Sequence, residues 1–254
     1  MLLITLKIGL NLLKKYTINF DLPERKKIQI KFIIIHYTGM KSETLAIKRL
    51  SNPKSKVSAH YFIKNNGKIL NLVPDSYIAW HAGKSLWKSY NSMNKHSIGI
   101  EISNPGHNNN YKNFSSNQIS SLSKLIKFLI KKYKIKKTNI LGHSDISPKR
   151  KKDPGEKFPW KILFKKGFIN WHKLKDKKIK IYRGLKLTLI EEEIFLKNLY
   201  KFGYCKIKNE NLSKNKIYLT KAFQRRFRQG LVNGKIDKEC LLISKSLIKT
   251  NNYA

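Results

Sequence analysis

The chain alternates between short apolar segments that fit strands and longer amphipathic segments that fit helices. Residues 28–37 predict a strand, and the continuous apolar run at 32–35 within it suggests burial on both faces. Residues 97–103 instead alternate strictly, with three isoleucines on one face and Glu101 on the other. Residues 57–64 and 68–73 are two further strands, and the Asn65-Asn66-Gly67 turn between them predicts a hairpin.

Helices are expected between these strands. Ser42 is a suitable N-cap for a short helix that Asn52-Pro53 stops. Ser115 to Gln118 is a capping box that opens a helix with an apolar stripe as far as Tyr133. Residues 138–142 predict one more short strand. Strands with interspersed helices favour an α/β (α+β) fold, with a mixed β-sheet flanked by helices.

The chain divides into four parts by composition. We expect an N-terminal extension over 1–22, a sheet domain over 23–174, a lysine-rich linker over 175–187 and a small three-helix domain over 188–254. The helices of the last part are predicted over residues 189–202, 219–229 and 237–249, the first two of them stopped by glycine.

Charge is the extreme feature of the composition. The 54 Lys and Arg against 15 Asp and Glu give a formal net charge of +39, which favours polyanionic partners. The basic residues are spread along the whole chain, and aromatic residues do not interleave with them as in nucleic-acid-binding surfaces. We therefore expect no specific nucleic acid partner.

The first 13 residues are apolar but interrupted by Lys7, and they do not have the order of a signal peptide. They are also too short and too charged to span a bilayer, so we expect no transmembrane segment. A short strand or a membrane-surface segment fits them better. Cys205 and Cys240 are either a disulfide pair or two small buried residues; the sequence leaves both readings open.

Candidate chemistry is concentrated at strand ends. His36 closes the first apolar strand, His143 follows the strand at 138–142, and Asp153 lies ten residues later before Pro-Gly. Two histidines and one aspartate form a three-ligand zinc set that leaves one position open, as in catalytic sites. Taken singly, each has an ordinary alternative: a buried structural histidine or a turn aspartate.

Glu101 and Lys151 complete the hypothesis. Glu101 is the only carboxylate within a strand pattern, and next to a metal it could act as general base and then return the proton to a leaving amine. Lys151 lies two residues before Asp153, so in an extended segment its ammonium group would stabilise an oxyanion beside the metal. The alternatives are a salt-bridge partner for Glu101 and a solvated charge for Lys151. Asp145, the other carboxylate nearby, is not retained as a ligand.

The other histidines differ in context. His81, within Trp80-His81-Ala82-Gly83, is the best candidate for a residue that contacts substrate. His60 is expected to be buried, and three more are expected at the surface: His96, His107 and His172.

Several of these segments together resemble a known family. The matching segments are residues 32–39, 57–61, 79–83, 97–102, 142–146, 150–155 and 158–160. In this order they resemble the type-2 N-acetylmuramoyl-L-alanine amidases, the AmpD- and AmiD-like zinc amidases, over residues 20–172. The resemblance implies Zn²⁺ held by His36, His143 and Asp153 at one edge of a mixed sheet, with Glu101 and Lys151 at the catalytic positions. It implies hydrolysis of the amide between N-acetylmuramic acid and L-alanine in peptidoglycan or muropeptides.

We expect Trp80, His81, Asn104 and Arg150 to contact that substrate. The tail resembles a peptidoglycan-binding-like three-helix domain, through residues 196–204, 220–227 and 234–237; the alternative is a bundle that only packs on the catalytic domain. Such tails accompany relatives that act on the wall itself, which favours the bacterial envelope (periplasm), whereas the lack of a clear signal peptide leaves the cytoplasm open. A non-catalytic peptidoglycan-recognition protein is the alternative function. The sequence indicates no oligomeric state.

Overall fold

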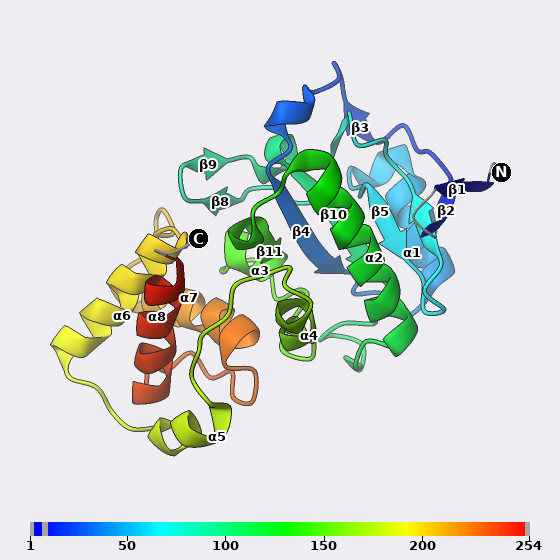
Figure 1. Ribbon diagram of the computed structural model, residues 1–254. Coiled ribbons are helices and arrows are strands. Elements are labelled where there is room, and N and C mark those ends of the chain that lie inside the picture. The colour runs from blue at the N-terminus through cyan, green and yellow to red at the C-terminus, as the bar shows by residue number, and fades with distance from the viewer. Residues whose placement is uncertain (1–2, 7–9, 252–254) are drawn as a thin grey trace.

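A mixed seven-stranded sheet forms the larger part of the molecule (Figure 1). The computed structural model of the protein describes residues 3–6 and 10–251; the remaining positions of the predicted N-terminal extension and of the tail lie outside the described residues. The strand order is β1 (Leu3–Leu6), β2 (Leu10–Lys14), β6 (Ile69–Asn71), β5 (Tyr61–Ile63), β10 (Ser97–Ile102), β4 (Phe32–Tyr37) and β11 (Ile140–Gly142).

The sheet contains both parallel and antiparallel strand pairs, and these agree with the sequence patterns of the strands. β4 is parallel to both of its neighbours, β10 and β11, and is almost completely buried, as its continuous apolar stretch predicts. β5 and β6 are antiparallel, which confirms the hairpin at Asn65-Asn66-Gly67. The pairing of β10 with β4 places Glu101 opposite His36, so these two side chains leave the sheet on the same face.

Two helices cover the two faces of the sheet. α2 (Ser116–Tyr133) lies across one face, seen in front of the sheet in Figure 1, and begins with the predicted capping box, in which the Ser115 hydroxyl accepts from the Gln118 amide. Its buried stripe, from Ile119 to Leu129, belongs to the main core. α1 (Glu43–Ser51) begins after Ser42, and its Ala46 and Leu50 pack with apolar side chains of β5 and β6.

Shorter elements complete the sheet domain. Two strand pairs lie beside the main sheet: β3 (Phe20–Asp21) with β7 (Ile78–Ala79), and β8 (Leu86–Trp87) with β9 (Tyr90–Asn91). Two short helices follow β11: α3 (His143–Ile146) and α4 (Trp160–Lys165). They enclose the loop that carries Asp153.

The helical unit at the C-terminal end contains α6 (Leu189–Phe202), α7 (Leu212–Phe227) and α8 (Lys238–Asn251). α6 matches its predicted range, but α7 begins seven residues before the predicted start at residue 219. The first turns of α7 are polar, and the pattern therefore gave no signal there. They are held by Asn211, which caps the helix, and by the buried amide of Asn215, which donates to the carbonyl of Ile207.

The helical unit and the sheet domain share one apolar core. Trp87 of β8 makes edge-to-face ring contacts with Phe202 and Tyr204, at centroid distances of 6.0 and 5.0 Å. Residues 175–187, predicted as a basic linker, include α5 (Asp176–Ile179), whose Ile179 is buried in the same core. Arg183 of this segment pairs with Glu239 of α8 at 2.7 Å. The C-terminal helical unit is therefore packed directly against the sheet domain, and the segment between them is part of the shared core.

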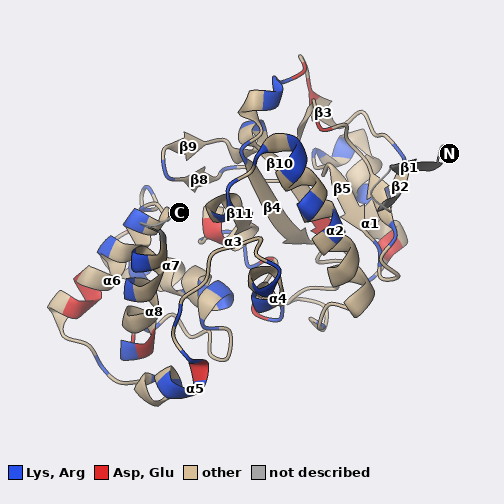
Figure 2. Cartoon of the chain, viewed as in Figure 1, with Lys and Arg blue, Asp and Glu red and all other residues tan. Residues whose placement is uncertain are grey.

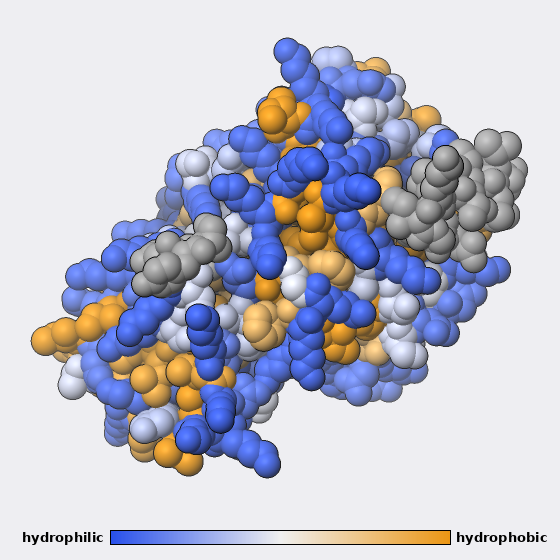
Figure 3. Space-filling model, in the orientation of Figure 1, coloured by the Kyte–Doolittle hydropathy of each residue, from blue (hydrophilic) through white to orange (hydrophobic). Residues whose placement is uncertain are grey.

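Charge is distributed over both parts of the molecule. Lys and Arg residues lie on every large helix, while acidic residues are few and scattered (Figure 2). The face shown in Figure 3 is mostly hydrophilic, with apolar side chains exposed over the helical unit, where Leu189 and Ile190 are more than two-thirds exposed. Across the described residues, no helix has the length and apolar character needed to cross a membrane. Cys205 and Cys240 are both free thiols.

Candidate active site

The three predicted metal ligands converge at the carboxyl ends of β4 and β11. His36 lies near the end of β4, His143 is the first residue of α3 directly after β11, and Asp153 comes from the loop before α4. The Oδ2 atom of Asp153 lies 3.0 Å from the Nδ1 atoms of both histidines, which are 2.9 Å from each other. All three residues are buried, and among the described residues they form a group able to hold one metal ion.

Hydrogen bonds behind the histidines assign their protons. The Nε2 atom of His143 lies 3.0 Å from the carbonyl oxygen of Ala82, which only accepts, so this nitrogen carries the proton. Its Nδ1 therefore presents a lone pair toward Asp153.

His81 assigns the proton of His36 by the same logic. The hydroxyl of Ser97 donates to the carbonyl of Met93 at 2.6 Å, so it accepts from Nε2 of His81 at 3.2 Å. Nδ1 of His81 is then an acceptor, and Nε2 of His36, 3.0 Å away, donates to it. The Nδ1 atom of His36 is left with a lone pair facing the site.

Two nitrogen lone pairs and a carboxylate thus face one another in a buried space. These electron-pair donors repel one another unless a cation lies between them. Histidine nitrogens and carboxylate oxygens are also ligand types that zinc prefers. The electrostatics agree: burial and the neighbouring His143 lower the pKa of His36 to about 4, so it stays neutral at physiological pH. Burial alone would raise the pKa of Asp153, but His143 and His36 outweigh it and keep this pKa well below its usual range. The residues present therefore fit a divalent metal ion.

Glu101 faces the same space from β10. Its Oε2 is buried without a hydrogen-bond partner among the described residues, and burial followed by repulsion from Asp153 raises its pKa to about 8. A carboxylate with a raised pKa, free of structural hydrogen bonds and beside a metal-ligand set, is suited to accept and return a proton.

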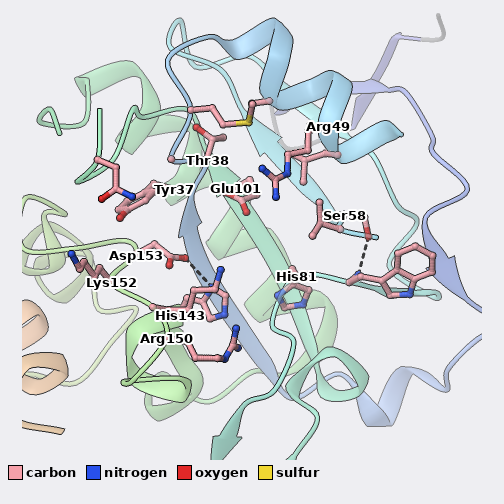
Figure 4. A pocket seen from close by; sticks show the side chains of 18 of the residues that line it. Tyr37, Thr38, Arg49, Ser58, His81, Glu101, His143, Arg150, Lys152 and Asp153 are labelled. Atoms are coloured by element: carbon pink, nitrogen blue, oxygen red, sulfur yellow. Dashed lines mark hydrogen bonds and ion pairs between the residues drawn. The ribbon is translucent and has the colours of Figure 1, made fainter. Parts of the chain in front are cut away.

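Glu101, His143 and Asp153 line a cleft of about 380 Å³ (Figure 4). Figure 4 shows Glu101, His143 and Asp153 around its floor, with Arg49 of α1 above Glu101 and Arg150 beside His143. Lys151 and Lys152 also line the cleft. Four basic side chains around one cavity favour a substrate that carries carboxylates.

The residues predicted to contact substrate lie in different settings. Trp80 and Arg150 line the cleft; the indole nitrogen of Trp80 donates to Asp21, and the guanidinium of Arg150 donates to the carbonyls of Ala82 and Lys84. His81 lines the cleft as well, although both of its ring nitrogens are engaged by His36 and Ser97.

Asn104 does not line the cleft. It is buried, and its amide donates to the Lys112 carbonyl and accepts from the Gly106 amide, within its own loop. Among the other histidines, His60 is buried as expected. His172, predicted at the surface, is buried as well, beside Trp171. His107 lines the cleft and bridges Tyr37 and Glu156.

Sequence reasoning missed the residues that support the ligands. Asn94 accepts with one oxygen from the backbone amides of both His81 and Ala82, at 3.1 and 2.7 Å. This fixes the segment that orients both ligand histidines. Gly99 is required below it, since a Cβ there would lie 2.3 Å from the His81 ring. In the sequence, only the Trp80-His81-Ala82-Gly83 segment points to these supporting residues, and it predicts contact with substrate. The contact of His81 with His36 is not visible there, because the two residues are 45 positions apart.

The role of His81 gives a direct prediction. His81→Leu removes the acceptor for His36, and we expect metal affinity to fall about 10–100-fold, as for other outer-shell partners of metal ligands. His81→Asn places an amide oxygen near the former Nδ1 position and should retain most of the affinity. Competition against a chromophoric chelator measures both. Equal losses in the two variants would show that the ring is needed only for packing.

The fold and the site define the class of protein: an α/β enzyme with the constellation of a metal-dependent hydrolase. Comparison with known proteins gives the family. Residues 26–156 match the family described as N-acetylmuramoyl-L-alanine amidase. The amidase AmiD of Escherichia coli is 32% identical over 247 residues, which cover 91% of this chain and 88% of AmiD. The chain belongs to the N-acetylmuramoyl-L-alanine amidase family and is an amide hydrolase.

Other relatives match either less than half of the chain or nearly all of it. The 1,6-anhydro-N-acetylmuramyl-L-alanine amidase AmpD of Haemophilus influenzae is 43% identical over 106 residues, 41% of this chain and 55% of AmpD. The solved structure of AmpDh3 from Pseudomonas aeruginosa matches with a TM-score of 0.78 and 29% identity, covering 92% of this chain and 96% of that one. The AmiD structure, with a TM-score of 0.76, covers 91% and 93%. The fold of both parts is thus shared with AmiD and AmpDh3.

Proposed function

We propose that the protein is a zinc-dependent amidase that cleaves the bond between N-acetylmuramic acid and L-alanine in peptidoglycan or its fragments. The observation that carries this is the convergence of two histidine lone pairs and the Asp153 carboxylate beside Glu101. The structure of AmiD was solved with anhydro-N-acetylmuramic acid-L-Ala-D-γ-Glu-L-Lys as substrate, and AmpDh3 with an anhydromuramic pentapeptide. Such ligands carry carboxylates, which suits the basic cleft.

The chain's own residues divide the chemistry. His36, His143 and Asp153 would hold the metal ion, which would polarise the scissile carbonyl and increase the acidity of water. Glu101 accepts the proton of the attacking water and returns it to the amine of L-alanine as the amide bond breaks. The Lys151 ammonium group stabilises the negative charge that develops on the carbonyl oxygen. Arg49, Arg150 and Lys152 attract the stem peptide.

The products of the reaction test the proposed bond. Incubation of the protein with a purified anhydro-muropeptide should release an intact stem peptide with a free L-alanine amino group, detected by mass spectrometry. The release should stop when a chelator removes the metal. Binding of the muropeptide without any product would instead support the non-catalytic recognition protein, and cleavage elsewhere in the peptide would contradict the proposed specificity.

The place of action is part of the proposal. We propose that the enzyme acts at the bacterial envelope, with its helical unit in contact with peptidoglycan. The net charge of +39 supports this because it would retain the protein on an anionic wall. Fractionation of cells, followed by detection of the protein, tests it: recovery only with cytoplasmic markers would contradict an envelope location.

A further inference from the structure

The C-terminal end of α7 contacts the segments that hold two of the metal ligands. Arg226, buried in this helix, donates from Nη1 to Oδ2 of Asp145 at 2.7 Å and from Nη2 to the carbonyl of Ile140 at 3.0 Å. Tyr204, from the loop after α6, donates to the other oxygen of Asp145 at 2.6 Å. Both carboxylate oxygens of one sheet-domain residue are thus bound by the helical unit.

Asp145 lies two residues after His143, in the same short helix. Its Oδ2 also accepts from the amide of Gly142, the residue before His143, at 2.8 Å. α3 contains only four residues, and a helix of that length has too few internal hydrogen bonds to hold its own geometry. The direction of the His143 side chain therefore depends on how Asp145 is held.

A second contact reaches the loop of Asp153. The side-chain amide of Gln229, two residues beyond α7, donates to the carbonyls of Glu156 and Phe158 at 2.7 and 2.6 Å. The two segments are joined in turn, since the amide of Ser144 donates to the carbonyl of Asp153 at 2.8 Å. The C-terminal end of α7 and the residues just after it therefore bind both the segment that carries His143 and the loop that carries Asp153.

The contact with Asp145 is desolvated. Arg226 and Asp145 are 2% and 1% exposed, and the guanidinium lies 4.6 Å from the ring centre of Trp160 in α4. A buried carboxylate that loses its cation is strongly disfavoured, so loss of Arg226 would displace the Asp145 side chain. That displacement alters the start of α3, where Asp145 accepts from the amide of Gly142.

We propose that the end of α7 is a positioning element of the metal centre: Arg226, through Asp145, and Gln229, through the Glu156–Phe158 backbone, hold His143 and Asp153 in ligating geometry. The inference rests on the proposed metal site and gives the helical unit a role besides wall contact. Loss of a residue that positions a metal ligand typically lowers metal affinity by about 10–100-fold, and we expect an effect of this size here.

The test compares two arginines of the same helix end in the full-length protein. Arg226→Met should weaken metal binding about 10–100-fold in chelator competition and change the visible spectrum of the Co²⁺-substituted protein. Arg228→Met is the matched control. Arg228 is equally buried, but pairs with Asp237 at 3.4 Å, inside the helical unit. It should leave metal affinity within about twofold of wild type, whatever its effect on thermal stability.

Milder variants guard against loss of folding. Gln229→Ala should weaken metal binding by a smaller factor, and Arg226→Lys, which keeps the charge, should recover part of the affinity lost in Arg226→Met. In an Asp145→Asn background, Arg226→Met should cost little more, because the two residues act together.

Three outcomes would overturn the inference: wild-type metal affinity in Arg226→Met, equal losses in the Arg226 and Arg228 variants, or no metal binding by the wild-type protein. A wild type that binds metal but releases no stem peptide would contradict only the proposed function, because the readout here is metal binding.

Discussion

Replacement of Glu101 by glutamine is expected to slow the release of stem peptide by about 10²–10⁴-fold while metal binding stays intact. Glutamine has the same shape but accepts no proton, so it removes the base and leaves the cleft in place. Glu101 is not among the grouped metal ligands, and its Oε2 has no hydrogen-bond partner in the part of the chain that the structure describes. Steady-state rates and metal content of Glu101→Gln give the two readouts. Near wild-type turnover would show that another group is the base.

The same variant has a second signature, in stability. In the folded, metal-free protein, burial and the nearby Asp153 raise the pKa of the Glu101 carboxyl from its ordinary value of 4.5 to about 8. Between these values the native state binds more protons than the unfolded chain, so stability falls as pH rises. Glutamine does not titrate. Glu101→Gln should therefore gain stability relative to wild type by about 1.4 kcal/mol per pH unit between pH 5 and 7.5.

Urea unfolding of the two metal-free proteins at several pH values measures this difference. The gap in the free energy of unfolding should widen steadily from pH 5 upward. A gap that is constant with pH would contradict the raised pKa of Glu101. The comparison matters because a carboxylate kept in an unfavourable environment is the expected cost of a base at a catalytic site.

Loss of His143 is the second change with a large expected effect. His143→Ala removes a direct ligand, so metal affinity should fall by more than the roughly 100-fold upper range for outer-shell partners, and turnover should fall with it. The matched control is His172→Ala, since His172 is also buried but lies outside the ligand group. Metal content after dialysis and chelator competition measure both proteins. Retention of a full equivalent of metal by His143→Ala would remove His143 from the ligand set.

The parts of the fold that could be predicted are those whose pattern is local. The unbroken apolar run of β4 and the alternation of β10 specify buried strands, and in a parallel pair they place His36 and Glu101 on one face. The hairpin at residues 65–67 follows from the turn chemistry of Asn-Gly. The three candidate metal ligands could be proposed because His36 and His143 lie at the ends of strands and Asp153 directly precedes a restrained Pro-Gly turn, and the structure brings them together.

Features set by distant partners could not be predicted. The sequence does not favour Asp145 as a ligand, but nothing nearby indicates that its partner is Arg226, 81 residues away. The sequence predicts that His81 contacts substrate, whereas the fold places its Nδ1 atom 3.0 Å from Nε2 of His36. The packing of residues 175–187 depends in the same way on a distant ion pair, that of Arg183 with Glu239. The start of α7 depends on side-chain hydrogen bonds of Asn211 and Asn215 to nearby backbone, which an apolar pattern does not reveal.

Titration of the metal-stripped enzyme with Zn²⁺ tests the metal-dependent amidase assignment most directly. Stem-peptide release from an anhydro-muropeptide should be absent in the stripped protein and rise in proportion to added Zn²⁺, reaching a plateau at one equivalent. His143→Ala should show no such recovery over the same range. Full activity of wild-type protein that is verified free of metal would contradict the assignment of His36, His143 and Asp153 as the ligands of a catalytic ion.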